Sequence, residues 1–287
     1  MKINAFAKVN LGLDIVGKNE KGYHDLKSIF VPITLHDQII IFPSRHEQFR
    51  VYPKFFIHPE KNTILKMIEV CRKHFNFKEQ FSITLHKHIP SQAGIGGGSA
   101  DAAAVFNYLI DFYGWNLSLD EKIEIAKEVG ADVPFCVFNH PALVEGIGDR
   151  LSFFSFKPNV HIVLVQAKKG VSTAKAFAGL DYPHLIHPTI DNIQEALIQQ
   201  DYELFIKSLG NSFEDVAIKL VPEIKVIKDK LIELGCDATQ MSGSGSVVMG
   251  FSQSEEVIDN CVNVLRGQVR FVRKTSLMVE PQDNLLK

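Results

Sequence analysis

A cluster of glycines between a predicted strand and a predicted helix is the segment with the clearest capacity for chemistry. Gly94, Gly96, Gly97 and Gly98 are followed directly by Ser99. Glycines let backbone N–H groups turn toward an anion, and a helix N-terminus adds unpaired donors and partial positive charge. A flexible turn is the simpler alternative, but four glycines in this position favour a phosphate-binding loop. The spacing matches neither the GxxxxGK[ST] loop nor the GxGxxG dinucleotide loop.

A strand near the N-terminus places two polar side chains on one face. Residues 2–16 alternate, with apolar side chains at odd positions and most polar side chains at even positions. A period of two is typical of a half-buried strand, so Lys8 and Asn10 project from the same polar face. A solvated strand lysine is the commoner explanation of Lys8 taken alone, and participation in chemistry is the other.

The remaining pattern predicts an α+β protein with an N-terminal domain over residues 1–154 and a C-terminal domain over residues 155–287. Pro32 indicates an edge or a bulge in its strand, and Ser118 with Glu121 forms a capping box. The predicted strands cover about 28–42, 81–89, 161–166, 246–251 and 268–280. The predicted helices cover about 62–75, 99–113, 118–130, 191–209, 222–234 and 255–265.

The composition is that of an ordinary globular protein. The 287 residues carry a net charge of −2, without a long apolar run or a block of like charges, which argues against nucleic-acid binding and a membrane span. The four cysteines lie far apart in the sequence, so we expect them to be buried and reduced and the protein to be cytoplasmic. His86 and His88 share a strand face, but two histidines without a third ligand predict no protein-held metal site.

Three motifs in order resemble the GHMP kinases, the superfamily of galactokinase, homoserine kinase, mevalonate kinase and phosphomevalonate kinase. They are AKVNLGLDIVG with GYH in residues 7–24, IPSQAGIGGGSADAA in residues 89–103 and MSGSGSVVMGF in residues 241–251. The resemblance spans nearly the whole chain and implies a two-domain GHMP kinase fold with its active site in the cleft between the domains. Within the superfamily, AKVNL, GYHDL and GADVPF are similar to the kinases that phosphorylate the 2-hydroxyl of a cytidine diphosphate-linked methylerythritol, in the non-mevalonate route to isoprenoid precursors.

The resemblance implies functions for individual residues. Asp132 in GADVPF matches a catalytic aspartate that accepts the proton of the acceptor hydroxyl, with Lys8 beside it, and a plain helix N-cap is the alternative for Asp132. Magnesium would arrive with ATP. The implied ATP-binding residues are Pro90, Ser91, Gln92, Ala93, Gly94, Ile95, Gly96, Gly97, Gly98, Ser99, Ala100, Asn62 and Lys87. The implied substrate-binding residues are Asn10, Tyr23, His24, Phe177, Gly243 and Ser244, with core packing as the alternative for the aromatic ones.

Two positions depart from the usual motifs. Ala100 stands where a second serine is common, which leaves Ser99 to contact phosphate or magnesium alone, and Ser246 stands where proline is common. A GHMP kinase acting on a mevalonate-like or homoserine-like acceptor is the nearest alternative, and Tyr23 with His24 discriminates against it because those acceptors contain no cytosine. A non-catalytic nucleotide-binding protein and an RNA-binding module are the alternatives from other classes. Both a monomer and a homodimer are compatible with the sequence.

Overall fold

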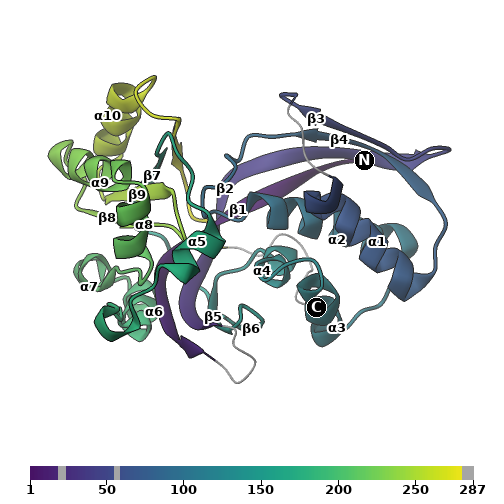
Figure 1. Cartoon of the computed structure of the whole chain (residues 1–287), viewed down its shortest axis with the longest axis horizontal. Helices are drawn as coiled ribbons and strands as arrows, with labels where there is room; N and C mark the ends of the chain where they lie inside the picture. Colours follow the sequence, from purple (N-terminus) through teal and green to yellow (C-terminus); the bar gives the residue numbers. More distant parts are fainter. Residues whose placement is uncertain (19–23, 55–58, 280–287) are drawn as a thin grey trace.

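The computed structural model describes residues 1–18, 24–54 and 59–279 and has two lobes, each with helices packed on a sheet (Figure 1). The α+β class predicted from the sequence is therefore confirmed. The first sheet is built from residues 2–153 and the second from residues 161–275. The division of the chain into domains at residues 154 and 155 stays a prediction.

A long antiparallel hairpin is the centre of the first sheet. It consists of β1 (Lys2–Lys18) and β2 (His24–Ser44). Pro32 of β2 lies beside a register shift in this pairing, and it falls between the parts of β2 that pair with β4 and β5. The predicted bulge is confirmed, because a residue without an N–H is tolerated where a ladder is interrupted. The other strands are β3 (Gln48–Tyr52), β4 (Gln80–His86), β5 (Ala142–Gly146) and β6 (Arg150–Phe153), in the order β3-β4-β2-β5-β6.

The strand predicted over residues 2–16 is confirmed as β1, but the prediction that it is half-buried is wrong. The odd-numbered residues from Ala5 to Ile15 are all buried. On the other face, Lys8 and Asn10 are only 3% and 0% exposed. Lys8 lies against Gly96 in the segment that joins β4 to the following helix, and Asn10 lies against residues 242–243, which follow Met241 in the second lobe. The polar face of β1 is therefore an internal wall and not a solvated surface.

The helices of the first lobe begin at the signals that the sequence carries. Asn62 is the N-cap of α1, and its side-chain oxygen accepts hydrogen bonds from two backbone N–H groups of the first turn. The capping box of Ser118 and Glu121 is confirmed at α3, which ends at Lys127, shortly before Gly130. These helices are η1 (Pro59–Lys61), α1 (Thr63–Phe75), α2 (Gly97–Tyr113), α3 (Leu119–Lys127) and α4 (Val133–Phe138).

The second lobe packs helices on an antiparallel sheet in the order β10-β7-β9-β8. The helix predicted over 191–209 is wrong as a single element: Gln200 has a left-handed φ of 60°, and Asp201 caps a new helix. The short α5, α8 and β8 were not predicted. The strands are β7 (His161–Gln166), β8 (Ala238–Met241), β9 (Val247–Ser252) and β10 (Phe271–Thr275). The helices are α5 (Thr173–Ala178), η2 (Tyr182–His184), α6 (Ile190–Gln199), α7 (Tyr202–Ser208), α8 (Glu214–Leu220), α9 (Glu223–Glu233) and α10 (Glu255–Leu265).

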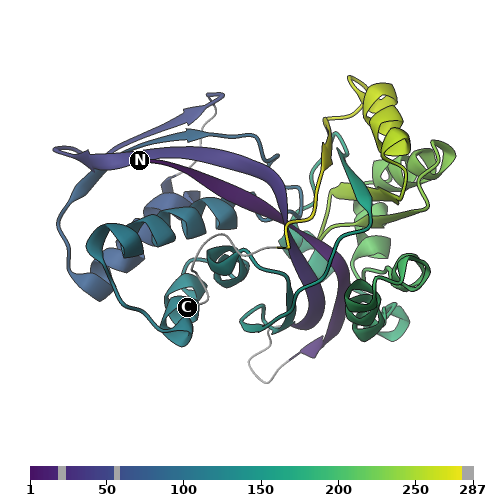
Figure 2. The same ribbon diagram turned by 180° about the vertical axis from the view of Figure 1, so that it is seen from behind.

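The β1–β2 hairpin connects the cores of the two lobes. It runs from the first sheet toward the helices of the second lobe, as Figure 2 shows from behind. Leu13 and Ile15, near the end of β1, belong to the apolar cluster of the second lobe. At Gly12 the approach of α6 is so close that a Cβ would lie 2.3 Å from Ile193 Cδ1. The N-terminal strand is thus part of both lobes and fixes one relative to the other.

Candidate active site

A cavity of about 870 Å³ is lined by residues from both lobes. Nearly all of the residues predicted to be functional lie around it. Tyr23 lies outside the described residues, and Ala100 does not line the cavity. The predicted residues that line it are Lys8, Asn10, His24, Asn62, Lys87, Pro90, Ser91, Gln92, Ala93, Gly94, Ile95, Gly96, Gly97, Gly98, Ser99, Asp132, Phe177, Gly243 and Ser244.

The segment between β4 and α2 has the shape of an anion cradle. Gly94 and Gly96 have φ values of +76° and +70°, and Gly96 is the N-cap of α2, where it has no side chain to cap the first turn. A Cβ on Gly96 would lie 3.1 Å from Lys8 Cγ, so the loop and the lysine approach closely. The start of this 17-residue helix therefore presents backbone N–H groups and the positive end of the helix dipole to the cavity, beside Lys8.

The third motif supports this loop from the other lobe. It includes the turn between β8 and β9, where Ser242 Oγ donates to the Gly94 carbonyl at 3.1 Å. The N–H of Val247 donates to the Ala93 carbonyl, also at 3.1 Å. The motif is therefore a hairpin, and the same hairpin is part of the cavity wall.

A strained residue at the start of the loop is held by the second sheet. Gln92 has a φ of +53°, which is uncommon for a residue with a side chain. Gln166 of β7 is fully buried, and its Nε2 donates to the Ser91 carbonyl at 2.9 Å. A Cβ on Gly170 would lie 2.7 Å from the Cβ of Gln92, so the chain packs tightly there as well. These contacts from the second lobe fix the conformation of the phosphate loop.

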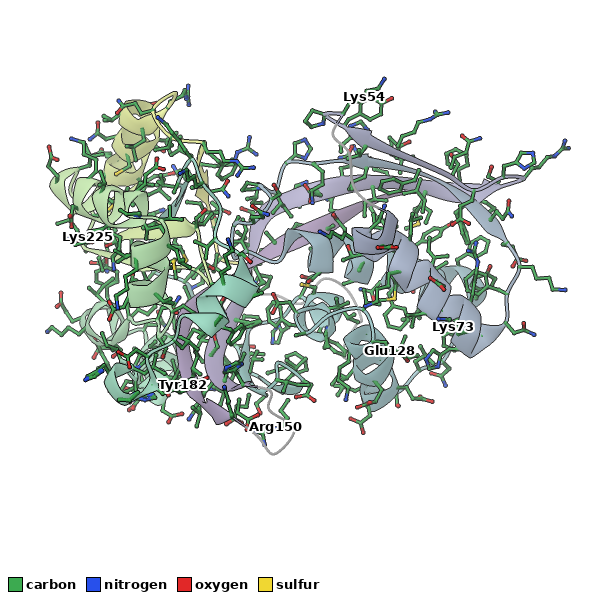
Figure 3. All side chains as sticks on the ribbon, in the orientation of Figure 1. Lys54, Lys73, Glu128, Arg150, Tyr182 and Lys225 are labelled. Carbon is green, nitrogen blue, oxygen red and sulfur yellow. The ribbon has the colours of Figure 1, made fainter. Side chains whose placement is uncertain are left out.

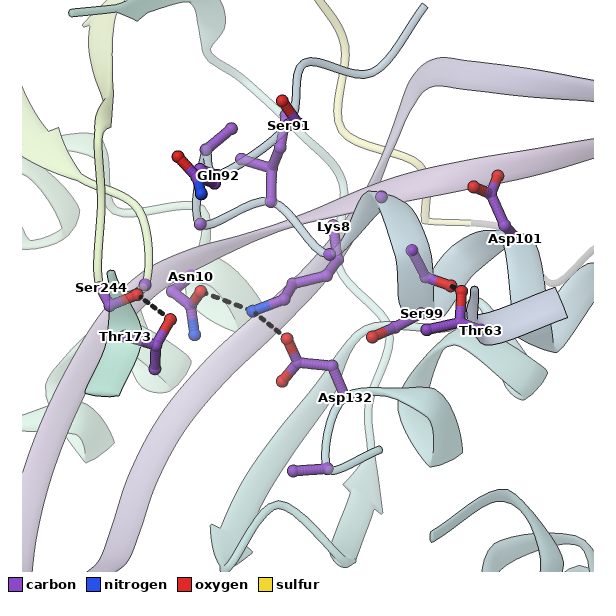
Figure 4. Close-up of a pocket in the computed structure, with 18 of the residues that line it drawn as sticks. Lys8, Asn10, Thr63, Ser91, Gln92, Ser99, Asp101, Asp132, Thr173 and Ser244 are labelled. Carbon is purple, nitrogen blue, oxygen red and sulfur yellow. Dashed lines mark hydrogen bonds and ion pairs between the residues drawn. The ribbon is translucent and has the colours of Figure 1, made fainter. Parts of the chain in front are cut away.

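Lys8 lies at the centre of the cavity wall. Its Nζ donates to Asn10 Oδ1 at 2.8 Å and lies 3.5 Å from Asp132 Oδ2 (Figure 4). The same nitrogen lies 3.9 Å from the centre of the Phe30 ring. Asp132 occupies the N-cap position of α4, but its side chain makes no capping hydrogen bond. The alternative that this carboxylate is a plain helix cap is therefore wrong. The carboxylate is 37% exposed and available to a bound molecule.

A buried charge network lies behind the phosphate loop. Lys87 Nζ contacts Asp37 and donates to Asp101 Oδ2 at 2.9 Å. Burial raises the pKa of Asp101 to about 7, with Lys87 acting in the opposite direction and Asp37 adding to the rise. Burial lowers the pKa of Lys87, but the two carboxylates outweigh this and leave it raised. Lys87 is thus paired with two carboxylates inside the cavity wall. Its contact with ATP stays a prediction.

This network predicts a pH-dependent stability. The pKa of Asp101 is about 7 in the folded protein, against an ordinary value of 3.8, so between these values the folded chain retains a proton that the unfolded chain loses. The unfolding free energy that Asp101 contributes is therefore fully present below pH 3.8 and is lost as the pH rises through about 7. In urea unfolding followed by circular dichroism, the unfolding free energy of Asp101→Asn should rise relative to that of the parent protein between about pH 4 and pH 7, and the difference should level off above that. A difference in unfolding free energy that does not change with pH would contradict this assignment.

Aromatic side chains gather at another part of the cavity. The rings of His24 and Phe177 stack with centroids 4.3 Å apart and an angle of 25°. Tyr182, labelled in Figure 3, lies nearly parallel to His24 at 6.2 Å. Burial, with the charge of Lys18, lowers the pKa of His24, so its ring is neutral at neutral pH and offers one donor and one acceptor. Such a cluster suits a flat heterocycle with hydrogen-bonding edges.

Hydroxyl groups around the cavity were missed by the sequence analysis. Thr63 Oγ1 donates to the Gly98 carbonyl at 2.6 Å, and Thr173 Oγ1 lies 2.8 Å from Ser244 Oγ. Both threonines are the first residues of helices, α1 and α5. Their position could have indicated a place in the site, because the first residue of a helix lies at the cavity that the helix N-terminus faces.

Ala100 is turned away from the cavity. The residue is 2% exposed within the core of the first lobe, and its N–H donates to the Gly96 carbonyl at 2.8 Å. The methyl that replaces the usual hydroxyl therefore packs against apolar side chains. Its predicted contact with ATP stays a prediction that this placement does not favour.

Residues 1–18, 24–54 and 59–279 contain neither a cluster suited to a metal ion nor a helix that could cross a membrane. Within these ranges, no three His, Cys, Asp or Glu side chains are grouped so that they could hold a metal ion. No helix in them is long and apolar enough to cross a membrane. The four cysteines are buried and free, and Cys236 and Cys261, distant in sequence, bring their sulfurs to 3.7 Å.

Family models and solved structures match this fold. The model described as GHMP kinases N terminal domain matches residues 62–140, and that described as GHMP kinases C terminal matches residues 193–270. The crystal structure of a 4-(cytidine 5'-diphospho)-2C-methyl-D-erythritol kinase has a TM-score of 0.82 at 28% identity and covers 98% of this chain and 100% of its own. A mevalonate kinase from L. major has a TM-score of 0.73 at 16% identity, covering 98% and 97%, and shares the fold.

The fold and the phosphate loop are those of a GHMP kinase, a class of ATP-using small-molecule kinases. A 4-diphosphocytidyl-2-C-methyl-D-erythritol kinase from Geobacillus thermodenitrificans is 35% identical over 270 residues, 93% of each chain, and one from Bacillus cereus is 32% identical over 280 residues, 97% of each chain. The chain therefore belongs to the family of 4-diphosphocytidyl-2-C-methyl-D-erythritol kinases. The family resemblance and the two-domain GHMP kinase fold inferred from the three motifs are both confirmed.

Proposed function

We propose that this chain transfers the γ-phosphate of ATP to the 2-hydroxyl of 4-diphosphocytidyl-2-C-methyl-D-erythritol, a step of the non-mevalonate route to isoprenoid precursors. The observation that carries the proposal is that one cavity contains a phosphate loop, the pair of Lys8 and Asp132, and the aromatic stack of His24 and Phe177. These three parts suit a triphosphate, a reacting hydroxyl and a cytosine.

ATP would bind through the loop from Pro90 to Ser99. Backbone N–H groups at the start of α2 would hold the phosphates, with Asn62 and Lys87 nearer the adenine. The cavity also contains the hydroxyl of Ser99 and the carboxylate of Asp132, oxygen groups of the type that Mg²⁺ prefers. When bound with ATP, Mg²⁺ supplies positive charge that neutralises the phosphate oxygens.

Asp132 would orient the acceptor hydroxyl and accept its proton. Lys8, fixed by Asn10 and Asp132, would offset negative charge on the group being transferred. The amide nitrogen of Asn10 has a second N–H, which is the group left for the acceptor itself. The chemistry thus requires that the ammonium and the carboxylate face the same point of the cavity.

The cytosine would be held by stacking and by the ring edge of His24. Stacking of a base on an aromatic ring contributes about 1–3 kcal/mol in nucleic-acid-binding proteins, and Phe177, which lines the cavity, supplies such a ring here. Tyr23 belongs to the same GYH motif and remains a proposed ligand. We also propose that the protein acts in the cytoplasm as a monomer or a homodimer and has no membrane partner. A nucleic-acid partner is not expected, because the net charge is only −2.

Coupled ADP release from MgATP tests this function. The purified chain would be given 4-diphosphocytidyl-2-C-methyl-D-erythritol, mevalonate, phosphomevalonate and homoserine in turn. Turnover with the cytidine compound alone is the expected result. Turnover with another acceptor alone would retain the kinase and remove the cytosine site, and ATP binding without ADP release from any acceptor would contradict catalysis.

A further inference from the structure

Ser28 of β2 is fully buried and is connected to the reacting pair through Asn10. Asn10 Nδ2 donates to Ser28 Oγ at 3.0 Å, and Asn10 Oδ1 accepts from Lys8 Nζ at 2.8 Å. The three side chains therefore form a continuous chain of hydrogen bonds from the sheet to the cavity.

The single proton of the serine hydroxyl determines which groups donate and which accept along this series of hydrogen bonds. Ser28 Oγ donates to the Gly12 carbonyl at 2.5 Å. The pairing of β1 with β2 shifts register between Asn10 and Gly12, which interrupts the ladder where this carbonyl lies. With its proton committed to Gly12, Ser28 Oγ accepts a hydrogen bond from Asn10, so the carboxamide presents its NH₂ group to Ser28 and its oxygen to Lys8.

The backbone of Asn10 is held independently of its side chain. Its N–H donates to Ser242 Oγ at 3.2 Å, and its carbonyl accepts from Gln240 Nε2 at 3.2 Å. The backbone hydrogen bonds therefore leave the orientation of the Asn10 carboxamide to be fixed by other contacts. A half-turn of the carboxamide would direct N–H donors at the ammonium of Lys8, which accepts no hydrogen bond and is only 3% exposed to water.

We infer that Ser28 is a positioning residue for phosphoryl transfer: it orients the Asn10 carboxamide so that its oxygen fixes Lys8 beside Asp132. The inference rests on the proposed function, because it explains how that site places its lysine. The inference requires a hydroxyl at position 28. Because this hydroxyl donates its only proton to Gly12, its oxygen can only accept from Asn10, and this selects the orientation of the carboxamide.

A double-mutant cycle on turnover tests the inference. Ser28→Ala should lower kcat about 10-fold, the usual consequence of one lost buried hydrogen bond, with the KM for ATP unchanged within about twofold. In an Asn10→Ala background the same substitution should change kcat by less than about twofold, because Ser28 acts through Asn10. Ser28→Thr keeps the hydroxyl and should restore most of the activity. Equal losses in both backgrounds would show a structural effect and overturn the inference.

A matched control and a second readout separate this inference from the proposed function. Ser82→Ala removes a hydroxyl from a buried serine of the same sheet, on β4 and outside the cavity lining, and should leave kcat unchanged. In ¹⁵N-labelled protein, the Asn10 carboxamide signal, identified by its loss in Asn10→Ala, should exchange with solvent about 10-fold faster in Ser28→Ala than in the parent. Unchanged exchange would overturn the inference. If the parent turns over none of the acceptors, the proposed function fails while the exchange measurement still decides the assignment of Ser28.

Discussion

Asp132→Asn is expected to yield a folded protein that turns over about 10²-fold or more slowly with MgATP and the cytidine acceptor. The substitution keeps the shape of the side chain and removes its negative charge and its capacity to take a proton. Steady-state ADP release measures the effect, and the thermal midpoint of unfolding verifies the fold.

The fold should survive because the carboxylate of Asp132 contributes little to local structure. It makes no capping hydrogen bond to α4, and its contact with Lys8 is 3.5 Å long and 37% exposed on the carboxylate side. The Lys8 side of the pair is buried, but its Nζ keeps the 2.8 Å hydrogen bond to Asn10 Oδ1 when the carboxylate is replaced. The same carboxylate shares the cavity with the phosphate loop, where an acceptor hydroxyl must be oriented and deprotonated.

Two further variants make this prediction specific. Lys8→Ala should lower turnover to a similar extent, and the double variant should be little worse than either, because groups that act as a unit are not additive. Asp149→Asn changes a partly exposed aspartate that lies 3.7 Å from Lys127, outside the cavity lining, and should turn over like the parent. Turnover of Asp132→Asn within about threefold of that control would remove Asp132 from the mechanism.

The elements around the site were predictable where the signal is local. The alternation in residues 2–16, the capping box at Ser118 and the glycines before α2 each specify structure within a few residues of themselves. The break at Gln200 was not predictable, because its left-handed φ of 60° carries no glycine signal. Propensity favours one continuous helix there, but the side chain of Asp201 accepts a hydrogen bond from the Leu204 N–H and starts a new helix.

Most of the predicted site residues line one cavity, but Thr63 and Thr173 were missed and the contacts between the site residues could not be predicted. The order of three motifs brought Lys8, the loop and Asp132 into one cavity through resemblance to known kinases. Pairs such as Lys87 with Asp37, or Gln166 with Ser91, are separated by 50 and 75 residues, and no periodicity connects them. For the same reason β1 was predicted as half-buried, since the loop that covers its polar face is distant in sequence.

Gly94→Ala is expected to raise the KM for ATP about 10-fold or more and to lower the unfolding free energy by more than the strain of its φ alone. The reason is the contact between the phosphate loop and the β8–β9 turn. A Cβ at Gly94 would lie 2.1 Å from the Ser242 carbonyl oxygen and 3.0 Å from the Gly245 nitrogen. Both are backbone atoms, so neither can rotate away, and the loop must separate from the turn that supports it.

Gly114, at the opposite end of the same helix, is a control that distinguishes backbone strain from a steric clash of the new Cβ. Its φ of +66° is close to the +76° of Gly94, but a Cβ at Gly114 would meet nothing within 4 Å. Gly114→Ala should therefore lose about 1–2 kcal/mol of unfolding free energy, from the left-handed backbone alone, and keep the KM for ATP of the parent. The additional loss in Gly94→Ala measures the contact between the lobes. If the two variants lose equal stability and bind ATP equally, the β8–β9 turn does not support the phosphate loop, and the second lobe affects ATP binding only through the residues that line the cavity.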